Sequence, residues 1–253
     1  MTIHQPLPEL TTQLRKLELS GMVATLDVRN QEAIANQMAY TEFLSLLVQD
    51  ELLTRDNRGY ERRLKLANLS GYKTIENFDF KFNPKINQAL IRDLVTGRFI
   101  MEKYPLLIIG PCGTGKSHIA QAIGLCAIRQ AINVICTSQT ELLQTLQTAK
   151  ATGNYSKRVR SLAKVTLLII DDFGLKPLRV PQDEDLHDLI AQRYEKTTTI
   201  VTSNLALHEW QQAFPNQLLG AATIDRLQHN AYILILEGMS YRSNKSQTSG
   251  GIE

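Results

Sequence analysis

The stretch at residues 106–117, Leu-Leu-Ile-Ile-Gly-Pro-Cys-Gly-Thr-Gly-Lys-Ser, constrains the fold of this chain more than any other. Its four consecutive aliphatic residues show no polar alternation, which is typical of a strand covered on both faces in a parallel sheet. Ile119, Ala120 and Ile123 then recur at helical spacing. The pattern predicts a buried strand, a glycine-rich turn, and a helix whose N-terminus points at that turn.

The turn matches the spacing G-x-x-x-x-G-K-S through Gly110, Gly115, Lys116 and Ser117. In such a loop backbone N–H groups and the helix dipole hold phosphate, the lysine reaches the terminal phosphates, and the serine hydroxyl holds Mg²⁺. The alternative, a glycine-rich strand-to-helix turn, leaves Lys116 unexplained. We therefore predict a bound nucleotide and Mg²⁺, with the nucleotide contacted by Gly110, Pro111, Cys112, Gly113, Thr114, Gly115, Lys116, Ser117 and His118.

A second continuously apolar strand is expected at residues 165–170, and it ends in Asp171 and Asp172. A nucleotide hydrolase needs one carboxylate that holds Mg²⁺ and one group that orients the attacking water. We assign the metal to Asp171 and the water to Asp172. Standing alone, this segment would favour a strand-ending aspartate in a tight turn. The phosphate loop makes that the weaker interpretation.

A third strand is expected at residues 198–202, followed by Ser203 and Asn204. Asn204 could hydrogen-bond the γ-phosphate or its attacking water, or it could cap the next turn.

The chain alternates strands with helices after residue 105, which predicts a doubly wound, five-stranded parallel α/β sheet. Leucines at helical spacing in the first seventy residues predict a small all-helical domain there. We expect a helical domain at 1–70, the α/β domain at 71–242, and a disordered polar tail at 243–253. The remaining strands are expected at 133–136 and 232–236, and helices of the α/β domain at 117–129, 140–149, 183–194 and 218–228.

The overall charge excludes little. The 253 residues carry a net charge of +3, so nucleic acid is allowed but not implied. No apolar run approaches the roughly 18 residues of a membrane span, and the first ten residues are too polar for a secretory signal. We expect a cytoplasmic protein without a membrane partner.

Basic residues gather in two stretches. Residues 150–164 contain five lysines and arginines and no acid, and they flank Gly153 and Asn154, which would let a loop project. We predict that Lys157, Arg158 and Arg160 contact DNA phosphates, although a solvated surface loop is an alternative for each. Residues 55–65 form the second stretch, for which a solvated helix face is the alternative.

Motifs beyond the phosphate loop carry a family resemblance. They are Asp171-Asp172, Ser203-Asn204, Asp225-Arg226-Leu227 and the run Gly-Met-Ser-Tyr-Arg at 238–242. With residues 17–22 and 78–84, they make nearly the whole chain resemble the IstB-like family. These are ATP-binding helper proteins of insertion-sequence transposition, and they are similar to the DnaC helicase loaders within the AAA+ ATPases.

The resemblance implies an AAA+ core with strand order 5-1-4-3-2 and with ATP and Mg²⁺ as cofactors. It implies that Asn204 is the sensor, and that Arg226 is an arginine finger acting on ATP held by a neighbouring copy in a homo-oligomer. Arg226 could instead be an ion-pair partner of Asp225. Two departures stand out: Asp172 stands where many AAA+ proteins have glutamate, and only eleven residues follow Arg242, too few for a full helical lid. Arg242 is therefore a weak candidate for a second sensor.

As a function, the resemblance implies an oligomeric ATPase that binds double-stranded DNA and assists a transposase. A helicase loader of the DnaC type is the alternative, although the first seventy residues lack the cysteine cluster typical of that loader. A small-molecule kinase ranks last, because no acceptor-site base or lid is recognisable.

Overall fold

The computed structural model describes residues 7–238 and 240–241, so Arg242 and the tail at 243–253 lie outside the described residues. The chain divides into two compact units, Met1–Arg62 and Arg63–Glu253. None of the described helices is both long enough and apolar enough to cross a membrane.

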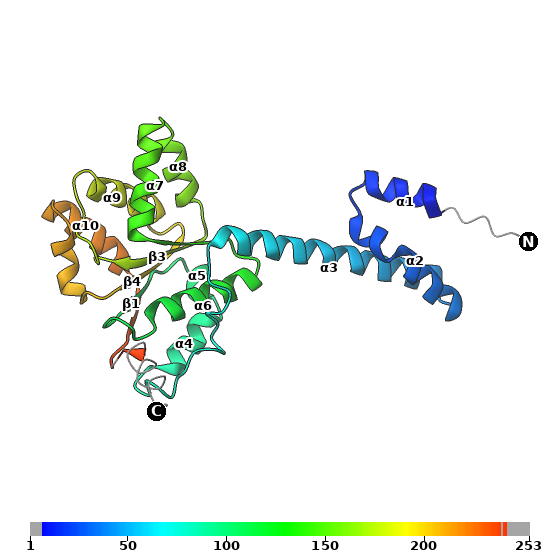
Figure 1. The fold of residues 1–253 in the computed structure, drawn as a ribbon, viewed down its shortest axis with the longest axis horizontal. Coiled ribbons are helices and arrows are strands. Elements are labelled where there is room, and N and C mark those ends of the chain that lie inside the picture. Colours follow the sequence, from blue (N-terminus) through cyan, green and yellow to red (C-terminus); the bar gives the residue numbers. More distant parts are fainter. Residues whose placement is uncertain (1–6, 239, 242–253) are drawn as a thin grey trace, which may run out of the picture. The chain divides into compact units, whose positions relative to one another are not determined.

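The first unit is helical. It contains α1 (Leu7–Lys16), α2 (Ser20–Ala35) and most of α3 (Tyr40–Ala67) (Figure 1). Glu51 of α3 caps α2, because its carboxylate accepts hydrogen bonds from the Gly21 and Met22 amides at 2.6 and 3.2 Å. A Cβ atom at Gly21 would lie only 2.7 Å from the Cα of Glu51. Glycine at this position therefore permits the close approach of the two helices.

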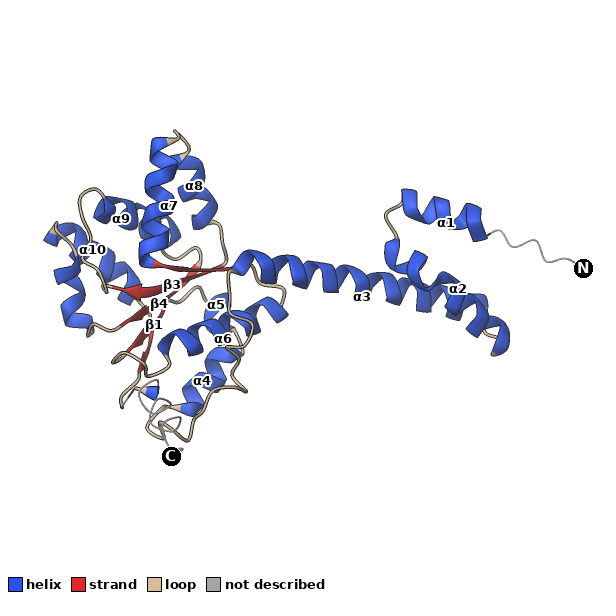
Figure 2. Cartoon of the chain, in the orientation of Figure 1, coloured by secondary structure: helices blue, strands red, loops and turns tan. Residues whose placement is uncertain are grey.

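The second unit contains a parallel sheet (Figure 2), whose five strands lie in the order β2-β3-β4-β1-β5. The α/β prediction is therefore confirmed, and the order, read in the opposite direction, is the 5-1-4-3-2 order that the resemblance implied. Strand β1 is fully buried, in agreement with its unbroken aliphatic sequence, and β4 is also fully buried although four of its six residues are threonine or serine. The strands are β1 (Leu106–Ile109), β2 (Val134–Ser138), β3 (Leu167–Phe173), β4 (Thr198–Ser203) and β5 (Tyr232–Ile235).

Helices cover both faces of this sheet (Figures 1 and 2). Helix α6 packs on one face, where α4 also lies. The other face carries α7, α8, α9, α10 and the short 3-10 helix η1, whose apolar side chains form one buried cluster with those of the strands. The helices that follow α3 in the sequence are α4 (Gln88–Val95), α5 (Arg98–Met101), α6 (Lys116–Arg129), α7 (Gln139–Ala151), α8 (Tyr155–Ala163), α9 (Gln182–Arg193), η1 (Leu207–Ala213) and α10 (Gln217–Gln228).

Helix α8 corrects the expectation that the basic stretch projects as a loop. Val159 and Leu162, three residues apart, are buried in the core, which fixes one helical face while the charged side chains lie on the others. Arg193 holds the end of α8, since its guanidinium donates to the carbonyl oxygens of Leu162 and Val165 at 2.7 and 2.8 Å. Burial lowers the pKa of Arg193 to about 9, which leaves the side chain charged at neutral pH.

Candidate functional site

The loop after β1 has the backbone geometry that phosphate binding needs. Gly113 and Gly115 adopt φ angles of 80° and 97°, which L-residues with a Cβ rarely adopt. Helix α6 begins directly after Gly115, and no side chain caps it there. Its first amides and its dipole therefore face the loop, where they favour a bound anion.

Lys116 connects the loop to the end of β4. The residue is only 5% exposed, and its Nζ donates to the carbonyl oxygen of Pro111 at 2.8 Å and to Oδ1 of Asn204 at 2.5 Å. Strands β1 and β4 are parallel neighbours, so their carboxyl ends meet at one edge of the sheet. The structure thus brings together two residues that sequence analysis assigned to catalysis from segments 88 positions apart.

Ser117 connects the loop to the end of β3. Its hydroxyl donates to Oδ1 of Asp171 at 2.8 Å, and the Thr202 hydroxyl donates to the same oxygen. A hydroxyl beside a carboxylate fits Mg²⁺, which binds proteins through few side chains and completes its octahedron with waters and substrate phosphates. The described residues contain no group of three or more His, Cys, Asp or Glu that could hold a metal by themselves.

Asp172 lies at an irregularity in β3. The register between β3 and β4 shifts between Ile170 and Phe173, and Asp172 takes a left-handed φ of 57°. Its amide donates to the Thr202 hydroxyl at 3.0 Å. A bulge of this kind re-aims a side chain, and Asp172 lines the same pocket as Lys116.

This pocket encloses about 510 Å³, within the usual range for a small-molecule site. Seven of the nine predicted nucleotide contacts line it, from Cys112 to His118. Pro111 instead accepts the Lys116 hydrogen bond, and a Cβ at Gly110 would meet the Leu236 carbonyl oxygen at 2.1 Å. His118 also bonds the carbonyl oxygen of Thr74 through Nε2 at 2.7 Å. It therefore holds the segment before the sheet against α6.

Sequence analysis missed the aromatic walls of this pocket. Phe78 lies over the loop, because a Cβ at Gly115 would be 2.6 Å from its ring. Phe82 and Tyr241 pack edge to face with ring centroids 5.0 Å apart, and the Tyr241 amide donates to the carbonyl oxygen of Gly113. The three phenylalanines at residues 78–82 lie in one of the stretches that carry the family resemblance, but sequence analysis assigned them no place in the nucleotide site. Aromatic walls beside a phosphate site suit the flat base of a nucleotide.

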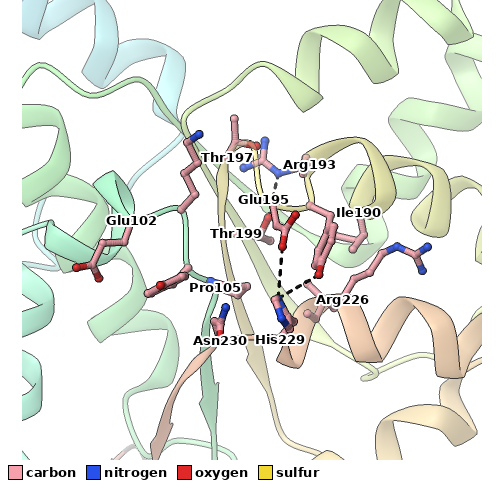
Figure 3. A pocket seen from close by; sticks show the side chains of 14 residues that line it. Glu102, Pro105, Ile190, Arg193, Glu195, Thr197, Thr199, Arg226, His229 and Asn230 are labelled. Carbon is pink, nitrogen blue, oxygen red and sulfur yellow. Dashed lines mark hydrogen bonds and ion pairs between the residues drawn. The ribbon is translucent and has the colours of Figure 1, made fainter.

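Arg226 lies at the end of the sheet opposite the phosphate loop. It lines a second pocket with Pro105, which precedes β1, whereas the phosphate loop follows β1. Its Nη1 donates to the carbonyl oxygen of Ala222 at 2.7 Å, and the ion pairs of the described residues include none between Arg226 and Asp225. Its guanidinium extends away from the contacts of His229 with Tyr194 and Glu195 (Figure 3). Arg226 therefore does not join the other predicted catalytic residues within one chain.

The three predicted DNA contacts are all exposed on α8, but only two of them line the same groove. Lys157 and Arg158 line a groove of about 700 Å³ between α7 and α8, whereas Arg160 does not. Lys150, another member of the basic stretch, pairs with the buried Asp185 at 2.5 Å. The groove is also lined by Glu141, Gln144, Thr145, Thr148, Ala149, Thr152, Asn154 and Ser161.

Comparisons with known proteins agree with this geometry. The family model described as IstB-like ATP binding protein matches residues 12–249. A Mycobacterium tuberculosis (strain ATCC 25618 / H37Rv) protein, described as ATP-binding in an insertion sequence, is 34% identical over 94% of this chain and 95% of its own length. The similarly described protein of insertion sequence IS21 from Pseudomonas aeruginosa is 32% identical over 96% of this chain and 91% of its own length.

Solved structures support the fold. DnaI shares a TM-score of 0.57 at 17% identity, covering 67% of this chain and 95% of its own. DnaA from Aquifex aeolicus bound to AMPPCP shares a TM-score of 0.58 at 18% identity, over 74% of this chain and 58% of that one. At these identities the likeness concerns the fold, which is that of the AAA+ P-loop ATPases.

Proposed function

The chain belongs to the IstB-like ATP-binding protein family, and from this membership we propose that it hydrolyses ATP with Mg²⁺ and uses the cycle to assist a transposase on double-stranded DNA. The observation that carries the proposal is the convergence of three strand ends through the Lys116–Asn204 and Ser117–Asp171 hydrogen bonds. A loop that only turned from strand to helix would need neither contact.

In the proposed reaction a water oxygen bonds to the γ-phosphorus of ATP while the bond from that phosphorus to the β,γ-bridging oxygen breaks. Lys116 binds the phosphates, and Ser117 with Asp171 holds the ion, which when bound neutralises phosphate charge. Asp172 orients the water and accepts its proton, and Asn204 donates to the γ-phosphate or positions the same water. The side chain of Asp172 is shorter than that of glutamate, so we expect slow turnover of ATP.

Asp172→Asn tests this assignment, because it keeps the shape of the side chain and removes the basic oxygen. We expect ATP affinity to be retained while the hydrolysis rate falls by roughly two orders of magnitude or more, the usual scale for a positioned base. Asp93→Asn, at an exposed position of α4, is the matched control and should leave both unchanged. Full hydrolysis by folded Asp172→Asn would move the role to another residue.

We propose that the active form is a homo-oligomer in which Arg226 reaches ATP held by a neighbouring copy. The position of Arg226 beside Pro105, at the far end of β1 from its own phosphate loop, supports a role between copies. An arginine supplied in this way stabilises charge on the phosphoryl group in the transition state.

We propose that DNA is bound through its phosphates, with Lys157, Arg158 and Arg160 as contributors. Helix α8 itself carries three cations and no acid, and a local cluster of this kind can bind duplex DNA even though the whole chain carries only +3 and Glu141 of α7 lines the same groove. Two of these side chains lie in a groove that also contains hydroxyl groups, which can donate to phosphate oxygens.

The transposase as partner is supported by the relatives, whose descriptions place them in insertion sequences. A helicase loader is the alternative, supported by the likeness in fold to the DnaC helicase loader, with a TM-score of 0.51 at 23% identity. With either partner, we assign ATP hydrolysis to residues 71–242 and treat residues 1–70 as a separate helical domain. We propose that the protein acts in the cytoplasm. Co-purification with ATP and duplex DNA, followed by identification of the retained protein, separates the two partners.

A further inference from the structure

Gln139 is a buried side chain that neither the motifs nor the proposed mechanism uses. It is the first residue of α7 and is 3% exposed. Its Oε1 accepts from the Gly174 amide at 2.9 Å, and its Nε2 donates to the carbonyl oxygen of Lys176 at 3.0 Å. One side-chain amide therefore spans three residues of the segment that follows Asp172.

These two bonds are not part of the cap of α7. Ser138 already caps that helix, because its hydroxyl accepts from the Glu141 amide while the Glu141 carboxylate accepts from the Ser138 amide. The Gln139 amide is thus directed away from its own helix. Its position follows from the sheet, since Ser138 pairs with Asp171 across β2 and β3.

The segment that Gln139 holds is the one that aims Asp172. Two side chains of β4 fix its beginning: Thr202 accepts from the Asp172 amide, and Ser203 donates to the carbonyl oxygen of Phe173 at 2.7 Å. Gln139 fixes its end from the other side. Asp172 takes a left-handed φ of 57°, which a residue with a Cβ keeps when its surroundings determine it, and Gly174 supplies a second left-handed φ of 76° without strain.

We propose that Gln139 is a positioning residue for the hydrolysis assigned above: by bonding residues 174 and 176 it fixes the bulge that directs the Asp172 carboxylate at the attacking water. The proposal rests on the proposed function. A displacement of about 1 Å in a catalytic group can cost about 100-fold in rate. Loss of the two bonds therefore acts on the rate of hydrolysis and leaves the nucleotide contacts of the phosphate loop intact.

Gln139→Leu in the full chain is the test, with Gln147→Leu on the exposed side of the same helix as the matched control. We expect kcat for ATP hydrolysis to fall about 10- to 100-fold, while the Kd for a non-hydrolysable ATP analogue changes less than about twofold. Amide hydrogen exchange at Gly174 should become faster in Gln139→Leu and stay unchanged in Gln147→Leu. Gln139→Glu keeps the acceptor for Gly174 but places an oxygen near the Lys176 carbonyl, so its kcat should be intermediate.

The double variant with Asp172→Asn shows whether Gln139 acts through Asp172. If it does, Gln139→Leu reduces the residual rate of Asp172→Asn no further, whereas independent effects multiply. An unchanged kcat in folded Gln139→Leu or Gln139→Glu overturns the proposal, as does a parallel loss of kcat and nucleotide affinity. A wild-type chain that binds ATP without hydrolysing it overturns the proposed function as well, so the two failures are distinguishable.

Discussion

Replacing Asn204 with aspartate tests whether the end of β4 faces the phosphates of ATP. The exchange keeps the shape of the side chain and places a negative charge 2.5 Å from the Lys116 ammonium. That carboxylate competes with the phosphates for Lys116 and repels them. We therefore expect folded Asn204→Asp to bind ATP more weakly than the wild type.

The size of the effect follows from Coulomb's law for a carboxylate and a phosphate charge in contact. Two unit charges about 4 Å apart interact by about 4 kcal/mol at an effective dielectric constant of about 20. The pocket opens to water and salt, so about half of this, about 2 kcal/mol, is the appropriate estimate. Since 1.4 kcal/mol corresponds to a factor of ten, ATP affinity should fall about 30-fold. ADP should be affected less, because it lacks the γ-phosphate.

Calorimetric titration with a non-hydrolysable ATP analogue gives these affinities. Asn204→Ala removes the acceptor without adding charge and should stay within about threefold of the wild type. Lys116→Ala should lose about 10- to 150-fold, the value of charge-assisted hydrogen bonds of about 1.5–3 kcal/mol. Wild-type affinity in folded Asn204→Asp, beside a clear loss in Lys116→Ala, would refute the inference that Asn204 faces the phosphates. Wild-type affinity in folded Lys116→Ala would refute the assignment of the phosphate loop as the nucleotide site.

Three further predictions concern assembly, DNA and the helical unit. Mixing Arg226→Ala with Asp172→Asn should restore partial ATP hydrolysis, because some interfaces then combine an intact arginine with an intact site; mixtures that co-assemble and stay inactive contradict action between copies. Neutralising Lys157, Arg158 and Arg160 together should flatten the slope of log affinity for duplex DNA against log salt by up to about 2.7, at ~0.9 per phosphate contact; an unchanged slope shifts the site to the basic stretch at residues 55–65. Hydrogen bonds from Arg55 and from the Met22 and Gly21 amides lower the pKa of Glu51 below its ordinary 4.5, so its stabilising contribution is complete above that value and is lost as pH falls through the lowered pKa. Thermal melts of Glu51→Gln should therefore fall below those of the wild type at pH 7 and converge with them in acid.

Sequence alone predicted the elements whose signals are local. Unbroken aliphatic runs marked β1 and β3, and the glycines of the loop stand where the backbone takes positive φ. Parallel strands place their carboxyl ends at one edge, so the meeting of Lys116, Asn204 and Asp171 follows from topology once those strands are assigned.

The parts that were missed depend on contacts between distant segments. Phe78 lies near the beginning of the α/β unit in the sequence and Tyr241 lies near its end. Both contact the loop, but nothing in their spacing along the chain indicates a shared pocket. Gln139 belongs to no recognised motif, and its hydrogen bond with the Gly174 amide forms only once β2 pairs with β3. Helix α8 was hidden because its charged residues outnumber its two buried ones, and core packing overrode the local appearance of a loop.

Arg226 shows how position can decide between roles that sequence leaves open. Because Asp225 and Arg226 are adjacent in the sequence, an ion pair between them is one possible interpretation. Adjacent residues of a helix, however, point to different sides. Arg226 instead donates to Ala222 one turn earlier, and its side chain lines a pocket at the amino end of β1. A guanidinium there cannot serve the phosphate loop at the carboxyl end of the same strand. Any ATP on which Arg226 acts therefore belongs to another copy, which is what the proposed homo-oligomer requires.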